Sequence, residues 1–212
     1  MKQKYEFTGE TMQYDGRTLH RIRALRDLDI YTCRSGFCNI HIKAGDIGGW
    51  ILSEDNLSHE GNCWVDGNAK IYGYAEIQDN AYVGGEAIVC GSKICGRAKV
   101  VENANVKGFV NVFGEAVIGG NAVVRYRSQI GGNATILGDT VVEYSNIGGN
   151  ATIAGAIKVH CKTLNEGLYD CEDDFREETP PPRTKRTHRS SVDFEALKQA
   201  HGEFCMSLLL GY

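Results

Sequence analysis

The sequence is poor in several features, and each shortage narrows the possible classes of protein. Only 3 prolines stand among 212 residues, and no apolar run approaches the roughly 18 residues of a membrane-spanning helix. The formal net charge is only −4, so a surface that coats nucleic acid is not expected. The first ten residues lack the apolar core of a signal peptide. These features favour a cytoplasmic protein with neither a membrane nor a nucleic acid as its partner.

Cysteine, in contrast, is not scarce, because the chain contains 8. In a chain long enough to bury a core and without a signal peptide, we expect free thiols rather than a disulfide framework. Cys33, Cys38 and His41 lie close together, but their C-x4-C-x2-H spacing is poor for zinc and no clear fourth ligand follows. We therefore predict no metal site.

The strongest feature of the sequence is a period of six residues. Four units that begin at Val65, Ile71, Ile77 and Val83 follow one another without a gap and read VDGNAK, IYGYAE, IQDNAY and VGGEAI. The same frame extends back through His59 to Ser53 and forward to Lys158, which gives eighteen units. Sixteen of the eighteen leading residues are Val or Ile.

Each position of the unit has a physical meaning. A β-branched leading residue suits a strand that packs inward, and the frequent Gly-Asn at the third and fourth positions tolerates the positive φ of a tight corner. The fifth residue is usually Ala, which is small enough to lie inside that corner. Three strands and three corners would close a coil of about 18 residues, so the repeats predict an all-β solenoid of about six coils.

This pattern resembles the hexapeptide-repeat family, and residues 48–65, GGWILSEDNLSHEGNCWV, look most similar to its YdcK-like subgroup from bacterial and phage genomes. The resemblance covers roughly residues 1–160. It implies a left-handed parallel β-helix that assembles as a homotrimer, and a phage-encoded origin is compatible with it. Members of the subgroup resemble hexapeptide acyltransferases and are described only provisionally as transferases.

The chain divides into four predicted segments: an N-terminal cap (1–52), the repeats (53–158), an irregular linker (159–190) and a C-terminal helix (191–212). In the cap we expect a small strand pair that includes residues 5–7 and an amphipathic helix over 18–28, which together cover the first coil. One face of that helix would hold Leu19, Ile22, Leu25 and Leu28. The linker carries acidic, proline and basic runs and reads as a solvated tether. The C-terminal helix presents an apolar stripe at Phe194, Leu197, Phe204 and Leu208.

Units three apart share a face, and the three faces are unequal. Two of them carry asparagine corners, at Asn62, Asn80, Asn133 and Asn150 and at Asn68, Asn103 and Asn121. On the third face, aromatic and basic residues replace this consensus: Tyr72, Tyr74, Lys107, Phe109, Arg125, Tyr126, Arg127 and Tyr144. Both five-residue units, 89–93 and 142–146, also fall there. Departures that gather on one side indicate a functional or assembly surface.

Two compatible interpretations of this face follow. Aromatic and Arg side chains are typical anchors of subunit contacts, so the face is predicted to form the seam of the trimer. The seam would also be a ligand groove, in which Arg125 and Arg127 hold an anionic group while Tyr72, Tyr74, Tyr126 or Tyr144 stack on a flat ring.

Candidate catalytic groups are few. Hexapeptide acyltransferases generally place a His base between subunits. Here His59 occupies a leading position and is expected in the core, while His160 lies just beyond the last unit. Cys90 and Cys95 should face outward, but no adjacent base is readable. The sequence also contains no phosphate-binding loop or dinucleotide fingerprint.

We therefore predict a non-enzymatic, homotrimeric scaffold that binds or sequesters a nucleotide-like or other anionic small molecule in the intersubunit groove and needs no cofactor. The first alternative is an acyltransferase that uses acetyl-CoA or another acyl-CoA, with His59 or His160 as its base. The second alternative is a structural module that docks onto a protein target through its C-terminal helix.

Overall fold

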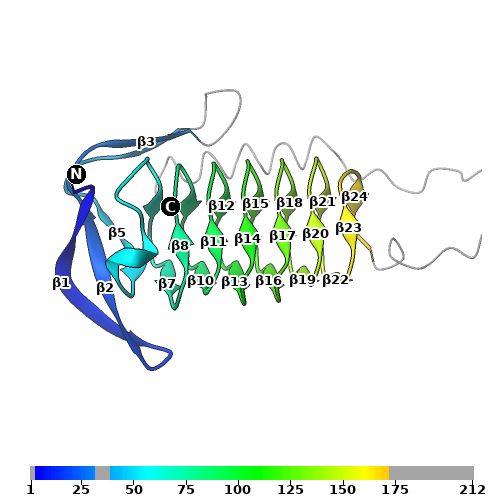
Figure 1. Cartoon of the computed structure of the whole chain (residues 1–212), viewed down its shortest axis with the longest axis horizontal. Helices are drawn as coiled ribbons and strands as arrows, with labels where there is room; N and C mark the ends of the chain where they lie inside the picture. The colour runs from blue at the N-terminus through cyan, green and yellow to red at the C-terminus, as the bar shows by residue number, and fades with distance from the viewer. Residues whose placement is uncertain (1–2, 32–38, 172–212) are drawn as a thin grey trace, which may run out of the picture.

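The computed structural model describes residues 3–31 and 39–171, and these form an all-β parallel solenoid of about seven turns (Figure 1). The described residues contain a single short 3-10 helix, η1 (Glu54–Asn56), and no helix among them is long and apolar enough to cross a membrane. The solenoid axis runs lengthwise in Figure 1, with the N-terminal strands at one end and the last turn at the other.

The strands belong to four sheets, and the three that wind around the solenoid form its sides. Sheet A contains β1 (Tyr5–Tyr14), β2 (Arg17–Ala24), β5 (Ile47–Ile51), β7 (Lys70–Tyr72), β10 (Ile88–Cys90), β13 (Asn105–Lys107), β16 (Val123–Arg125), β19 (Val141–Glu143) and β22 (Lys158–His160). Sheet B is the antiparallel pair β3 (Leu28–Tyr31) and β4 (Asn39–Ile42).

The other two sides are parallel throughout. Sheet C contains β8 (Glu76–Ile77), β11 (Lys93–Ile94), β14 (Asn111–Val112), β17 (Gln129–Ile130), β20 (Asn146–Ile147) and β23 (Thr163–Leu164). Sheet D contains β6 (Trp64–Val65), β9 (Tyr82–Val83), β12 (Lys99–Val100), β15 (Val117–Ile118), β18 (Thr135–Ile136), β21 (Thr152–Ile153) and β24 (Leu168–Tyr169).

The predicted inward column of β-branched residues is confirmed. On sheet A the leading residues pair directly from one turn to the next and are fully buried: Ile71, Val89, Val106, Val124, Val142 and Val159. Each such side chain stabilises the fold by about 1.5–3 kcal/mol through the burial of apolar surface. The asparagine corners also stack, since Asn103 donates to Asn121 and Asn133 donates to Asn150 across successive turns.

The predicted frame is wrong for the first two units. Ile51 pairs with Ile71 and Leu57 bridges to Ile77, and both are fully buried, so they hold the inward positions of the first turn. Ser53 and His59, which the frame placed there, are only half-buried. A closed interior selects the apolar side chains over the polar ones. The mismatch in spacing lies after η1, because Ile51 and Leu57 are six positions apart but Leu57 and the next leading residue, Val65, are eight apart.

Asn56, within η1, ties this irregular turn to the next one. Its Oδ1 accepts the backbone N–H groups of Leu52 and Ser53 at 3.0 and 3.1 Å. Its Nδ2 donates to the carbonyls of Gly73 and Ala75 at 3.1 and 2.8 Å. The first turn has η1 and a single β-bridge where the later turns have a strand of sheet C. The buried amide of Asn56 forms hydrogen bonds with backbone groups in this irregular segment and in the next turn.

The predicted helix over residues 18–28 is also wrong. Most of that segment is β2, which pairs antiparallel with β1 and, through His20 and Arg21, with β5. Leu25 is 41% exposed although the helical spacing placed it on the apolar face. Pairing with β5 across the sheet outweighs the weak local periodicity. The expected strand at residues 5–7 lies within β1, and the hairpin extends sheet A beyond the first turn (Figure 1).

The solenoid continues past residue 158. Val159 is fully buried, and Leu164 and Tyr169 pack against the core, so β22, β23 and β24 complete a further turn. The expected six coils are therefore about seven. The acidic, proline and basic runs and the C-terminal helix of the prediction lie almost entirely at residues 172–212, outside the described residues.

Two substitutions test which residue of the first turn lies in the interior: one at Leu57, which the structure places there, and one at His59, which the sequence repeat placed there. We expect Leu57→Ala to lower the free energy of unfolding by about 2–5 kcal/mol, because it leaves a cavity in the closed interior. His59→Ala should cost only about 1 kcal/mol, since the side chain is half-buried. Urea denaturation of both variants measures the difference, and a larger loss for His59→Ala would contradict the observed frame.

Candidate functional site

The eight residues predicted on the third face all lie on sheet A or in the corner that follows it. Tyr72, Lys107 and Arg125 end strands β7, β13 and β16, and the others stand in the turns immediately after the sheet A strands. The face is therefore continuous along the solenoid. Its two ends nevertheless have different surroundings.

The corner after sheet A keeps its left-handed backbone in every turn from β7 to β22, but its residues change. The left-handed position is glycine in three earlier turns, at Gly73, Gly91 and Gly108, and Tyr126, Tyr144 and Cys161 occupy it later with φ of 58°, 49° and 52°. A side chain in this region costs roughly 1–2 kcal/mol relative to the right-handed form. Glycine would fit these corners at lower cost, so the fold itself does not explain the two tyrosines.

These tyrosines belong to a row of exposed aromatic side chains, the aromatic ridge, formed by Tyr74, Phe109, Tyr126 and Tyr144. Their exposed fractions are 90, 71, 42 and 53%. The rings of Tyr126 and Tyr144 stack with centroids 5.2 Å apart, and His160 meets Tyr144 edge-on at 5.6 Å. Exposed rings that gather along one side of a protein are typical of an interaction surface.

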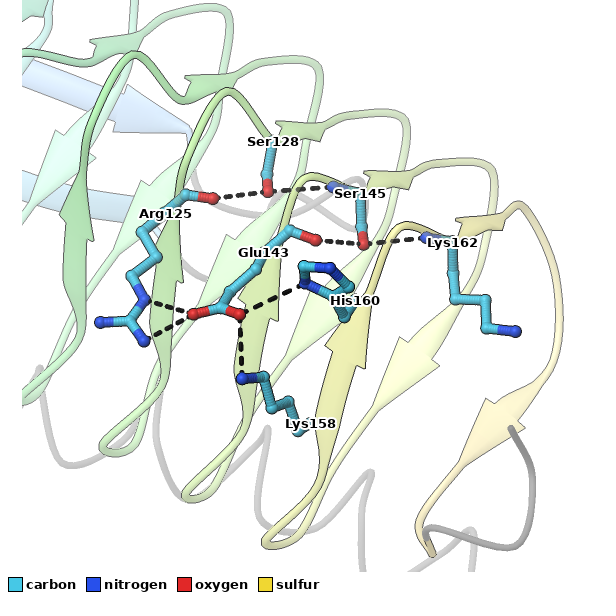
Figure 2. A network of polar contacts seen from close by, with 7 residues as sticks. All are labelled: Arg125, Ser128, Glu143, Ser145, Lys158, His160 and Lys162. Carbon is cyan, nitrogen blue, oxygen red and sulfur yellow. Dashed lines mark hydrogen bonds and ion pairs between the residues drawn. The ribbon is translucent and has the colours of Figure 1, made fainter. Parts of the chain in front are cut away.

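Figure 2 shows a cluster of charged groups around Glu143, which contacts the ridge through Arg125 and His160. The carboxylate of Glu143 accepts hydrogen bonds from Nε of Arg125 at 2.7 Å and pairs with Nζ of Lys158 at 3.0 Å and Nδ1 of His160 at 3.3 Å. Only 6% of the Glu143 side chain is exposed. Hydrogen bonds from Lys158 and Arg125 lower the pKa of Glu143 to about 2.

Glu143 changes the role expected of Arg125. The Arg125 guanidinium is already paired with the Glu143 carboxylate. It also lies 4.9 Å from the ring centroid of Tyr126. We therefore assign Arg125 to positioning the tyrosine ring and not to binding the anion of a ligand. Arg127, one residue after Tyr126, is exposed and also has a left-handed backbone. The sequence analysis missed Glu143 and Lys158, although Glu143 follows Arg125 by 18 residues, one full turn.

Buried serines hold the backbone behind this cluster (Figure 2). The Ser128 hydroxyl donates to the carbonyl of Arg125 at 2.8 Å and accepts the N–H of Ser145 at 3.2 Å. Ser145 in turn donates to the carbonyl of Glu143 at 2.7 Å and accepts the N–H of Lys162 at 3.1 Å. The irregular corners thus keep their backbone groups satisfied, which fixes the main chain that carries Arg125 and Glu143.

The other end of the face lies under the N-terminal hairpin. Tyr72 is 9% exposed, with its ring edge-on to Tyr14 at 5.6 Å and the Arg17 guanidinium 5.3 Å from its centroid. Burial raises the pKa of Tyr72 to about 12. A groove between the hairpin tip and sheet A is lined by Tyr14, Asp15, Tyr72, Cys90, Asn105 and Lys107. Tyr72 therefore packs against the hairpin and does not face the solvent as Tyr74 does.

The two candidate histidines also differ. His59 is half-buried rather than a core residue, and its Nδ1 accepts the backbone N–H of Lys4 at 3.2 Å while its ring stacks on Tyr5 at 4.4 Å. These contacts give it a structural role in the first turn. His160 is 53% exposed and lies against Glu143 in the last turn.

The remaining candidates from the sequence are the possible metal ligands Cys33, Cys38 and His41 and the thiols of the repeats. His41 pairs with Asp29 at 2.6 Å, and Cys33 and Cys38 lie outside the described residues. Within residues 3–31 and 39–171, no group of three His, Cys, Asp or Glu side chains is arranged to hold a metal ion. Cys63, Cys90, Cys95 and Cys161 are free thiols, and Cys90 and Cys95 are half-buried.

No protein-family model matches this sequence, and no curated protein matches it. The parallel solenoid is consistent with a hexapeptide-repeat fold, and the site must be interpreted from its own geometry.

The charge cluster makes a prediction about pH. Because the pKa of Glu143 falls from 4.5 to about 2 on folding, its ionised form stabilises the folded state. That contribution is fully present above about pH 4.5 and is lost as the pH falls towards about 2. The difference in unfolding free energy between the wild type and Glu143→Gln should be constant near neutral pH and shrink across this window. Glu76→Gln, on exposed sheet C, is the control, and a pH-independent Glu143→Gln difference would contradict the assignment.

Proposed function

We propose that this chain is a non-enzymatic binding scaffold. Its ligand surface consists of Tyr126 and Tyr144 of the aromatic ridge together with the adjacent Arg127 and His160. The observation that carries the proposal is the stacked tyrosine pair on a left-handed backbone. Side chains that cost stability and remain exposed are expected where they serve binding. Membership of the YdcK-like subgroup is part of this proposal.

The chemistry of the surface favours a molecule with a flat ring and a negative charge. Tyr126 and Tyr144 offer an aromatic surface on which a nucleobase can stack, and Arg127, the residue after Tyr126, supplies an exposed guanidinium. Lys158 and His160 add basic groups around the single carboxylate of Glu143. A nucleotide-like anion satisfies both requirements.

Sheet A is also better suited to self-association than sheet C. Its outward positions in successive turns include Ile88, Val123 and Val141, which are half-buried. The equivalent positions of sheet C are polar, at Lys93, Asn111, Gln129 and Asn146. A homotrimer that buries sheet A would place the ridge along the seam between subunits, as apolar centres with polar rims are typical of such contacts.

Replacement of the strained tyrosines by glycine should weaken ligand binding without lowering the stability of the fold. The double variant Tyr126→Gly, Tyr144→Gly should fold at least as stably as the wild type, because glycine adopts the left-handed backbone without strain. It should bind ADP at least about tenfold more weakly in calorimetric titrations, since a stacked base contributes about 1–3 kcal/mol. Arg127→Ala should weaken binding as well.

Two controls match these changes. Phe113→Ala removes a partly exposed ring from the sheet C side, and Arg97→Ala removes an exposed guanidinium there, and neither should affect ADP binding. A wild-type chain that does not bind ADP, or equal affinities in all variants, would overturn the nucleotide proposal.

The acyltransferase alternative is favoured by one observation. Nδ1 of His160 lies 3.3 Å from the Glu143 carboxylate, and an exposed imidazole oriented by a carboxylate is a common arrangement for a general base. Among residues 3–31 and 39–171, no carboxylate is paired with His59, whose Nδ1 accepts the backbone N–H of Lys4.

Release of thiol from acetyl-CoA, in the presence of small amine acceptors, tests this alternative. If the chain is an acyltransferase, His160→Gln should lower the rate by at least about a hundredfold, the usual contribution of a general base. His59→Gln, the control, should leave the rate unchanged if it folds. Absence of thiol release by the wild type would leave the scaffold as the better proposal.

A further inference from the structure

A lysine is completely buried where the N-terminal strand meets the first turn of the solenoid. Lys4 is 0% exposed, which is rare for this residue type unless its charge is paired. Its Nζ donates to the carbonyl of Cys63 at 2.8 Å and to that of Glu60 at 3.4 Å. The third neighbour is the Sγ of Cys63, only 3.0 Å away, and this side chain is also fully buried.

The surroundings favour the uncharged forms of both groups. Burial lowers the pKa of the Lys4 ammonium and raises the pKa of the Cys63 thiol. In its uncharged form the amine carries a free electron pair, and this nucleophilic nitrogen then lies in contact with an oxidisable sulfur. The proposed ligand surface does not involve either residue.

From this contact we propose that Lys4 and Cys63 are a modification site, at which dioxygen converts the pair into a covalent nitrogen–oxygen–sulfur bridge. One oxygen atom enters between Nζ and Sγ, the amine and the thiol each lose one hydrogen, and the second oxygen atom leaves with both hydrogens as water. Nitrogen and sulfur are each oxidised by two electrons, and dioxygen accepts all four. No other reactant is needed.

The geometry suits this product better than competing oxidations. The two atoms are already in hydrogen-bond contact, so one bridging atom joins them with little movement of the backbone. The Sγ is otherwise surrounded by carbonyl oxygens, those of Ile77 at 3.4 Å and Ser58 at 3.6 Å. The complete burial of Cys63 admits a small apolar oxidant but excludes bulky thiols such as glutathione.

The bridge would lock the N-terminal hairpin onto the solenoid. Lys4 directly precedes β1, and Cys63 directly precedes β6 of the first complete turn. A covalent link between segments so far apart in the chain restricts the unfolded state, as a disulfide does. The melting temperature of the aerated protein should therefore rise, and treatment with dithiothreitol should reverse the rise.

High-resolution mass spectrometry of the full chain tests the proposal directly. Protein kept in air should gain one oxygen and lose two hydrogens relative to protein kept anaerobically, and dithiothreitol should remove the change. In the modified fraction trypsin should no longer cleave after Lys4, and the peptide that contains Lys4 should be joined to the one that contains Cys63.

Variants identify the two atoms. Lys4→Arg and Cys63→Ser should each abolish the mass change, whereas Cys95→Ser, which alters a half-buried thiol elsewhere, should retain it. The wild-type result does not depend on whether the variants fold. Gain of an oxygen without loss of hydrogen would indicate a sulfenic acid, and loss of two hydrogens alone would indicate a disulfide or a direct sulfur–nitrogen bond. Either of these results, or an unchanged mass in air, would overturn the bridge.

Discussion

The structure depends on one constraint, the stacking of each turn directly on the next. Backbone hydrogen bonds such as those from Tyr82 N–H to the Ala98 carbonyl and from Lys99 N–H to the Ala116 carbonyl hold the turns in register. A corner can therefore change its side chains but not its path. This explains why Tyr126 and Tyr144 adopt the left-handed backbone of the glycines in the preceding turns. In these corners the hydroxyls of the buried Ser128 and Ser145 form hydrogen bonds with backbone groups of the same or the next turn.

The same constraint shows which parts of the fold the sequence predicts. From Val65 to Ile153, where only two five-residue units interrupt the six-residue period, the leading residues lie in the interior as expected, because each unit contributes one strand and one corner. The prediction failed in the first turn, where Leu57 and Val65 are eight positions apart instead of six, and at Arg17–Ala24, where pairing with β5 overrides local periodicity. Both failures arise from contacts between distant segments, which no local pattern records.

The candidate site was predictable in position but not in its electrostatics. Counting units three apart placed Arg125, Tyr126 and Tyr144 on one face, and the strands bear this out. The pairing of Arg125 with Glu143 was not anticipated, although the two residues occupy the same position of successive turns, because the period shows which residues are neighbours but not which of them form an ion pair. With Arg125 engaged, the proposed anion contact moves to Arg127, and the tyrosine pair becomes the main determinant of binding.

The central claim is that sheet A and its aromatic ridge form the surface through which the chain assembles and binds. A crystal structure of the assembled protein tests it most directly. The account predicts three subunits that meet through sheet A, with Val123 and Val141 buried and the ring of Tyr126 at the seam. A monomer, or an assembly that meets through sheet C and leaves the ridge in solvent, would contradict it.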